Sequence, residues 1–81
     1  MGYTVHVNNL SFKIQDEEEL KALFENKFGE VKKVHLVKDE HGRSKGYAFI
    51  EFLEERDMNK AIKEKEITIK ERLAIIKKSS R

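Results

Sequence analysis

The segment Lys45–Phe52 constrains the fold of this chain more than any other stretch of it. From its third residue onward the segment favours an extended strand, in which successive side chains point to opposite faces. The two faces differ in chemistry: one carries Tyr47, Phe49 and Glu51, and the other carries Ala48, Ile50 and Phe52. The second face is typical of a core. The first leaves two aromatic rings in water beside a basic residue, so we expect a ligand to cover them.

Length and composition limit the chain to one small domain. Its 81 residues are enough for a single modest core. The absence of cysteine excludes disulfides and thiolate metal sites. No stretch approaches the roughly 20 apolar residues of a membrane span, and we see no leader sequence. We expect one soluble, intracellular module over residues 1–81, with its core at about residues 3–78.

The charged residues are segregated, although the net charge is only +2. Acidic side chains concentrate at residues 16–19 and 54–57. Basic side chains flank the aromatic segment or form a C-terminal tail at residues 77–81: Lys38, Arg43, Lys45, Lys77, Lys78 and Arg81. This arrangement is typical of a surface that meets a polyanion, and an ordinary solvated surface is the alternative.

A first strand is predicted over residues 3–7, and the two asparagines that follow it provide turn chemistry. Val5 and Val7 then face the core, and His6 lies on the same face as the exposed rings of the later strand. An imidazole can stack on a nucleic-acid base, with less apolar area than a phenyl ring. The alternative is an exposed strand histidine without a role.

Two amphipathic helices are predicted. The first begins after Asp16, an N-cap with Glu19 three residues further on, and ends at Gly29. Its apolar stripe comprises Leu20, Leu23, Phe24 and Phe28. The second helix covers residues 54–65 and turns Met58, Ala61 and Ile62 inward.

The remaining strands are predicted at residues 31–37 and 73–76, with a mobile polar loop at 38–44 that carries Arg43 toward a ligand. Alternation in the first of these strands places Val34 and Leu36 inward and His35 and Val37 outward. The last strand is apolar throughout, which leaves its register open. One register buries Ala74 and Ile76 and exposes Ile75 and Lys77; the other exposes Ile76 and Lys78. Residues 67–69 favour a short additional strand.

This order of elements is that of the α+β ferredoxin-like sandwich, the split βαβ fold with a βαββαβ order. Such a domain has a four-stranded antiparallel sheet with two helices on one face. The face without helices would carry His6, His35, Tyr47 and Phe49.

Two motifs resemble the signatures of the RNA recognition motif (RRM) family. Lys45–Phe52 fits the RNP1 pattern at all eight positions, with Ile50 in place of the usual valine. Val5–Leu10 resembles RNP2, except that His6 stands where the family usually has phenylalanine or tyrosine. The resemblance covers residues 3–78.

The resemblance implies a module that binds single-stranded RNA by stacking bases on the exposed sheet face. Tyr47 and Phe49 would be the main platforms, His6 a weaker third, and Lys45 a partner of phosphate. The other candidate RNA-binding residues are Asn8, Arg43, His35, Glu51, Lys77 and Lys78. We expect at most micromolar-class affinity for the isolated module.

Two other classes of function compete with RNA binding. The first is a protein-interaction module on the same fold, although Lys70–Leu73 lacks the Arg-x-Phe that marks one peptide-binding subgroup of the family. The second is an enzyme, which is disfavoured because the three histidines are scattered and Ser44 has no evident base. We expect neither a cofactor nor a metal.

The resemblance also implies a larger parent protein. Residues 68–76 faintly resemble RRMs of splicing-related snRNP recycling factors, a segment too short to name a pathway. Nuclear RNA processing, including mRNA processing and splicing, is the commonest setting for the family. We therefore expect a monomeric, nuclear module with other RRMs or proteins of the parent chain as partners, no membrane partner, and the cytoplasm as the alternative location.

Overall fold

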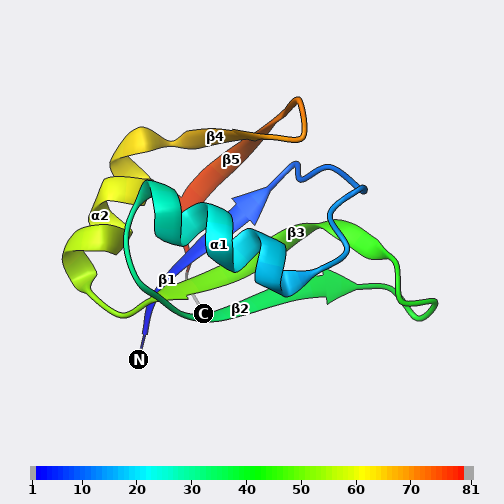
Figure 1. Ribbon diagram of the computed structural model, residues 1–81, viewed down its shortest axis with the longest axis horizontal. Helices are drawn as coiled ribbons and strands as arrows, with labels where there is room; N and C mark the ends of the chain where they lie inside the picture. Colours follow the sequence, from blue (N-terminus) through cyan, green and yellow to red (C-terminus); the bar gives the residue numbers. More distant parts are fainter. Residues whose placement is uncertain (1, 80–81) are drawn as a thin grey trace.

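The computed structural model describes residues 2–79 and arranges them in two layers, an antiparallel sheet and two helices that cover one of its faces (Figure 1). The strands are β1 (Tyr3–Asn8), β2 (Val31–Lys38), β3 (Ser44–Phe52), β4 (Glu66–Ile69) and β5 (Arg72–Lys78), and the helices are α1 (Glu17–Lys27) and α2 (Glu55–Glu64). The strand order is β2-β3-β1-β5-β4, so β1 is central. The end of the expected basic tail, with Arg81, lies outside the described residues.

The sheet has five strands, which corrects the expected number of four. The additional strand is β4, at the segment that favoured a short strand, and it pairs with β5 as a hairpin from Glu66 to Ile75. Lys70 and Glu71 form the two-residue turn between them, with φ of 50° and 65°. Two positive φ values are typical of the type I′ turn, whose twist matches that of paired strands. Neither residue is the glycine or asparagine that usually signals such a turn, so the sequence pattern indicates this hairpin only weakly.

The core fills the space between the sheet and the helices. The inward strand residues are buried as alternation predicted, among them Val5, Val7, Ala48, Ile50 and Phe52. Three phenylalanines form an aromatic cluster within this core, with ring centroids 5.6 to 6.4 Å apart: Phe24, Phe28 and Phe52. Met58 and Ala61 of α2 are buried in the same core, as predicted.

The register of β5 is the one that buries Ala74 and Ile76. Ile76 lies opposite Val7 of β1, and Lys77 lies opposite His6. Because paired residues share a face of the sheet, Ile75 and Lys77 lie on the face away from the helices. The alternative register is excluded.

Helix α1 closes the outer edge of β2. Asp16 is its N-cap, and the carboxylate accepts from the Glu18 N–H at 2.9 Å. Further along, Glu17 accepts from the backbone N–H of Leu36 at 2.8 Å, and Glu25 accepts from that of Val31 at 3.1 Å. An edge strand offers its free backbone N–H groups to any neighbouring chain, and these two carboxylates bind two of them. No local sequence pattern indicates this role, because helix and strand meet only in the folded chain.

Gly29 follows α1 in a backbone conformation that only glycine adopts readily. Its φ is 154°, and a Cβ at this position would overlap the carboxylate of Asp57. That carboxylate is buried and lies 3.3 Å from the Lys60 ammonium, which also donates to the Phe28 carbonyl. The start of α2 is thereby fastened to the turn between α1 and β2.

We expect Gly29→Ala to lower the free energy of unfolding more than Gly42→Ala. Gly42 also has a positive φ, 79°, but a Cβ there meets nothing within 4 Å. Gly42→Ala, the control, should lower the free energy of unfolding by about 1 kcal/mol, because alanine adopts a positive φ less readily than glycine. Gly29→Ala should cost about 1–3 kcal/mol more, because the Asp57 carboxylate has to move. Urea unfolding measures both, and equal losses would contradict this account.

Candidate nucleic-acid interface

Three aromatic rings meet on the helix-free face at the junction of β1 and β3. His6 lies directly opposite Phe49 in the strand register. The His6 ring is 5.0 Å from that of Phe49 and 5.4 Å from that of Tyr47, and the last two rings are 6.2 Å apart. All three side chains are half-buried. We call His6, Tyr47 and Phe49 the aromatic face.

A shallow hollow adjoins the aromatic face on its β2 side. Its volume is about 210 Å³, and its lining residues are Thr4, Lys33, His35, Phe49 and Glu51. His35 lies opposite Phe49 in the register, as alternation predicted. The hollow therefore offers a ring together with a cationic donor and a carboxylate acceptor. That combination suits the edge of a nucleic-acid base.

On the other side of the aromatic face, β5 contributes Ile75 opposite Asn8 and Lys77 opposite His6. Lys78 lies opposite Val5 and is therefore on the helix side of the sheet, which corrects its expected place beside the rings. A cation and an apolar side chain thus border the rings on this side.

A hydrogen-bonded clamp fastens the end of β1 to the start of β5. Asn9 has φ of 62°, and its side-chain amide donates to the Leu73 carbonyl at 2.7 Å. Arg72 donates to the Asn9 side-chain oxygen at 2.8 Å and to its carbonyl at 3.3 Å. The side-chain oxygen of Asn8, an expected RNA-binding residue, accepts from the Asn9 N–H at 2.9 Å. One of its polar atoms is therefore already hydrogen-bonded within the protein. Sequence reasoning missed Arg72, because only the fold brings it to Asn9.

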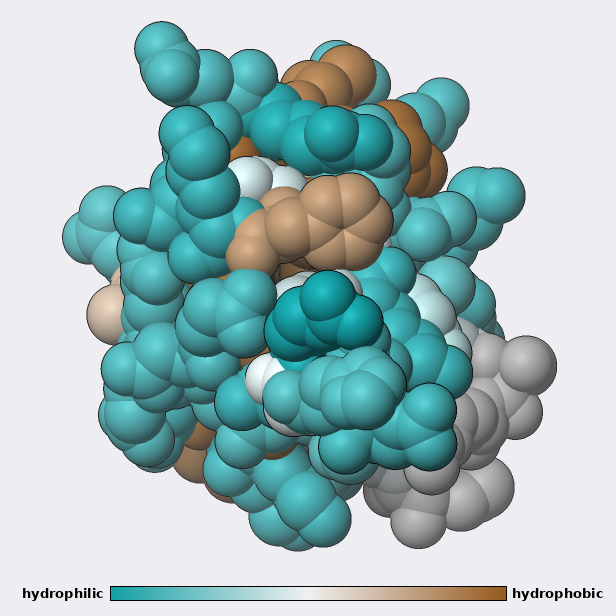
Figure 2. All heavy atoms as spheres, turned by 90° about the vertical axis from the view of Figure 1, so that its right-hand side faces the viewer, coloured by the Kyte–Doolittle hydropathy of each residue, from teal (hydrophilic) through white to brown (hydrophobic). Residues whose placement is uncertain are grey.

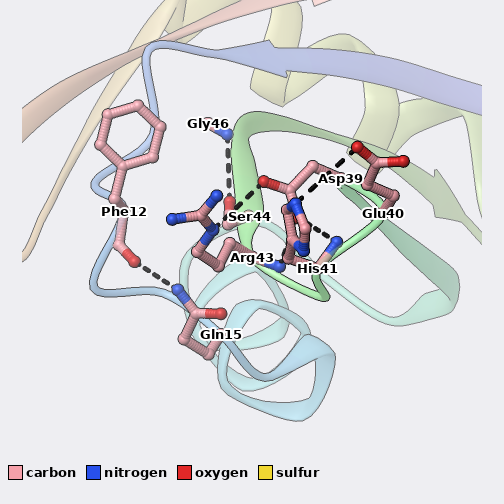
Figure 3. A network of polar contacts seen from close by, with 8 residues as sticks. All are labelled: Phe12, Gln15, Asp39, Glu40, His41, Arg43, Ser44 and Gly46. Atoms are coloured by element: carbon pink, nitrogen blue, oxygen red, sulfur yellow. Dashed lines mark hydrogen bonds and ion pairs between the residues drawn. The ribbon is translucent and has the colours of Figure 1, made fainter.

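The loop between β2 and β3 is folded around Asp39 (Figure 3). One carboxylate oxygen accepts from the backbone N–H groups of His41 at 2.8 Å and Arg43 at 3.0 Å. The other lies 3.3 Å from Nε of Arg43. Arg43 is exposed but already paired, while Lys45 is exposed on β3.

Ser44 stabilises the start of β3. It is buried, and its hydroxyl oxygen accepts from the Gly46 N–H at 3.0 Å.

The hydrogen bonds that Asp39 accepts also lower the pKa of its carboxyl group. The backbone N–H of Arg43 has the largest effect, followed by the His41 N–H and the Arg43 charge.

A larger hollow, about 590 Å³, lies away from the aromatic face between the end of α1 and the β4–β5 hairpin. Its lining mixes Lys27 with Glu64 and Glu66 and holds no aromatic ring, so it suits a polyanion poorly. Within residues 2–79 no three His, Cys, Asp or Glu side chains are grouped to hold a metal ion. No helix in this range is long and apolar enough to cross a membrane.

An aromatic face that is bordered by cations, on a sheet backed by two helices, is typical of the α+β domains that bind single-stranded nucleic acid. Comparison with known proteins gives the family. A profile of the RNA recognition motif matches residues 5–73. The chain therefore belongs to the RNA recognition motif family, and the resemblance seen in its sequence is confirmed.

Known relatives support this assignment. The chain is 42% identical over 62 residues to the U1 small nuclear ribonucleoprotein 70 kDa of Arabidopsis thaliana, and 42% identical over 65 residues to nucleolin of Gallus gallus. These matches cover 75% and 80% of this chain, but it spans only 14% and 9% of the two relatives. The Rna15 RRM with bound RNA (GU) is similar in structure, with a TM-score of 0.84 at 29% identity, covering 100% of this chain and 86% of that one.

We expect the Asp39 carboxyl to titrate below its ordinary pKa of 3.8, because its hydrogen bonds favour the charged form. The contribution of this carboxylate to folding is then fully present above pH 3.8 and is lost as the pH falls through the lowered value. NMR titration of the His41 and Arg43 amide signals measures the midpoint. Asp39→Asn is the control, since these signals should then show no such titration. A midpoint at or above 3.8 would contradict the hydrogen bonding described for this loop.

Proposed function

We propose that this chain binds single-stranded RNA by stacking bases on the aromatic face. The observation that carries the proposal is the meeting of three rings within 5.0 to 6.2 Å on adjacent strands. Phe49 and Tyr47 would be the stronger platforms, since a phenyl or phenol ring offers more apolar area than the imidazole of His6. Membership of the RNA recognition motif family supports this interpretation.

The surrounding side chains divide into two groups by their chemistry. Lys45, at the start of β3, and Arg43, in the loop before it, suit phosphate oxygens. Lys77 and Asn8 border the rings on the β5 side, and His35 and Glu51 border them on the β2 side. These four groups suit base edges, so they would set sequence preference. Lys78, on the other side of the sheet, would contribute only long-range attraction.

The biological setting is part of the proposal. The two relatives named above are far longer than this chain, so we infer that it acts as one module of a larger RNA-processing protein. One of them is named as a small nuclear ribonucleoprotein, and a further relative, from Botryotinia fuckeliana, as part of a translation initiation factor. Splicing in the nucleus is the setting we favour, and the cytoplasm is the alternative.

The stacking proposal predicts that Tyr47→Ala combined with Phe49→Ala weakens binding to short labelled RNAs by about 30-fold or more, because each stack contributes about 1–3 kcal/mol. Fluorescence anisotropy at several salt concentrations measures this. The matched control is Leu53→Ala, which shortens another exposed apolar side chain beyond the far end of β3. It should leave affinity unchanged.

Salt dependence separates the two candidate classes of partner. RNA affinity should fall log-linearly as salt rises. A folded wild type that binds no RNA, or whose binding ignores salt and the double substitution, would refute the proposal. Either result would favour a protein partner on the aromatic face instead.

His6→Phe should bind short labelled RNAs about two- to fivefold more tightly than the wild type, because a phenyl ring stacks on a base better than an imidazole does. His6 lies opposite Phe49 in the register, so the larger ring would join the same aromatic face. Fluorescence anisotropy measures the change. An unchanged or lower affinity would argue against stacking at His6.

A further inference from the structure

The two edges of the sheet differ. At the β2 edge, Glu17 and Glu25 of α1 accept from backbone N–H groups of the strand. At the opposite edge lies β4, and within residues 2–79 the only strand paired with it is β5. Figure 1 shows β4 along the upper border of the sheet. One side of the β4–β5 hairpin is therefore open to another chain.

The backbone groups that β4 turns to its open side follow from the hydrogen bonds of the hairpin. The Ile76 N–H donates to the carbonyl of Lys65, the residue before β4, at 2.8 Å. The register of the hairpin continues from this pair without a shift. Bonded and non-bonded pairs alternate along antiparallel strands, so Ile67 bonds to β5. Glu66 and Thr68 then turn their backbone N–H and C=O groups away from β5.

The other strand of the hairpin has the same phase. Thr68 lies opposite Leu73, and the Leu73 carbonyl accepts from the side-chain amide of Asn9 on the β1 side at 2.7 Å. This carbonyl therefore points away from β4, as expected for a non-bonded pair. Glu66 and Thr68 are both exposed. Two N–H donors and two C=O acceptors thus line the open edge.

The hollow of about 590 Å³ described above adjoins this edge, because residues 66–68 of β4 line it. Leu23 of α1, Ile67 and Leu73 provide apolar walls, and Leu73 is 43% exposed. Figure 2 shows apolar side chains among hydrophilic ones at the top of the molecule, the end where Figure 1 places the hairpin. Unsatisfied backbone groups and an apolar hollow therefore lie side by side.

The charges of the hollow indicate which kind of chain fits it. Lys27 carries a positive charge, and Glu64 and Glu66 carry negative ones. The carboxylates repel RNA, and a second copy of this chain would bring the same carboxylates to the same edge. A peptide of another protein can place residues of both signs beside an apolar one. An ion pair of 2.9 Å between Lys70 and Glu19 fastens the hairpin turn to α1, so the site is largely preformed.

We propose that the open edge of β4 is a docking site for an extended peptide segment of another protein, which adds a sixth strand to the sheet. The peptide backbone pairs with the N–H and C=O groups of Glu66 and Thr68. Alternate side chains of the peptide face the hollow, and an apolar one contacts Leu23. Because β5 separates β4 from β1 and β3, this site does not depend on the proposed function, and RNA and peptide can bind together.

The test selects random peptides of about eight residues, displayed on phage, against the wild-type chain, and measures the enriched peptides by fluorescence anisotropy. Thr68→Pro removes the outward N–H and keeps the hydrogen bonds of the hairpin. It should weaken binding of these peptides about tenfold or more, because a partner carbonyl loses its donor. Thr68→Val is the matched control. It keeps the N–H and should bind within about twofold of the wild type.

Hydrogen exchange on the wild-type chain, measured by NMR, needs no variant and applies even if Thr68→Pro fails to fold. In the free chain the Ile67 amide should exchange slowly and the Thr68 amide fast. An enriched peptide should protect the Thr68 amide. A slow Thr68 amide in the free chain, or one that the peptides leave unprotected, would overturn the proposal.

The remaining outcomes identify a different occupant or none. A selection that enriches no peptide, or only peptides that bind wild type and Thr68→Pro equally, refutes the site. Peptides that a short RNA displaces lie on the aromatic face and count against it as well. A concentration-dependent dimer in sedimentation that Thr68→Pro abolishes would replace the peptide by a second copy of the chain.

Discussion

The pairing of β1 with β3 is the constraint on which the rest of the structure depends. It sets Val5 against Ile50 and Val7 against Ala48 on the inner face, and it sets His6 against Phe49 on the outer face. A slip of one residue would exchange the two faces, so burial of the inner pairs fixes the outer pair as well. The hydrophobic core thereby holds the aromatic face in register, although the rings themselves are only half-buried.

Polar side chains support the sheet at its β2 edge and at the junction of β1 with β5. Glu17 and Glu25 of α1 accept from backbone N–H groups along the edge of β2, and the Asn9–Arg72 clamp joins β1 to β5. An edge strand that is covered as β2 is resists pairing with other chains. The acidic residues that segregate in the sequence thus have a structural task on the helix side, and cations border the open face.

The loops at one end of the sheet have an internal order that alternation alone could not reveal. In the loop between β2 and β3, Asp39 accepts from the backbone N–H groups of His41 and Arg43 and pairs with the Arg43 side chain. The loop between β1 and α1 is anchored by the buried side chains of Leu10 and Ile14, and Leu10 donates to the Gly46 carbonyl of β3. Both loops are thus shaped by contacts that form only in the folded chain.

The sequence by itself determined the order of the main elements, the inner and outer faces of β1 and β3, and the N-cap at Asp16. These features depend on the spacing of neighbouring residues, which can be read locally. Only the tertiary structure decided the register of β5, the pairing of β4 with β5 across an unusual turn, the place of Lys78 and the contact of Asn9 with Arg72. Four consecutive apolar residues have no period to fix a register, and residues 63 positions apart in the sequence, such as Asn9 and Arg72, meet only when the sheet forms, because pairing partners and buried area are chosen across the whole fold.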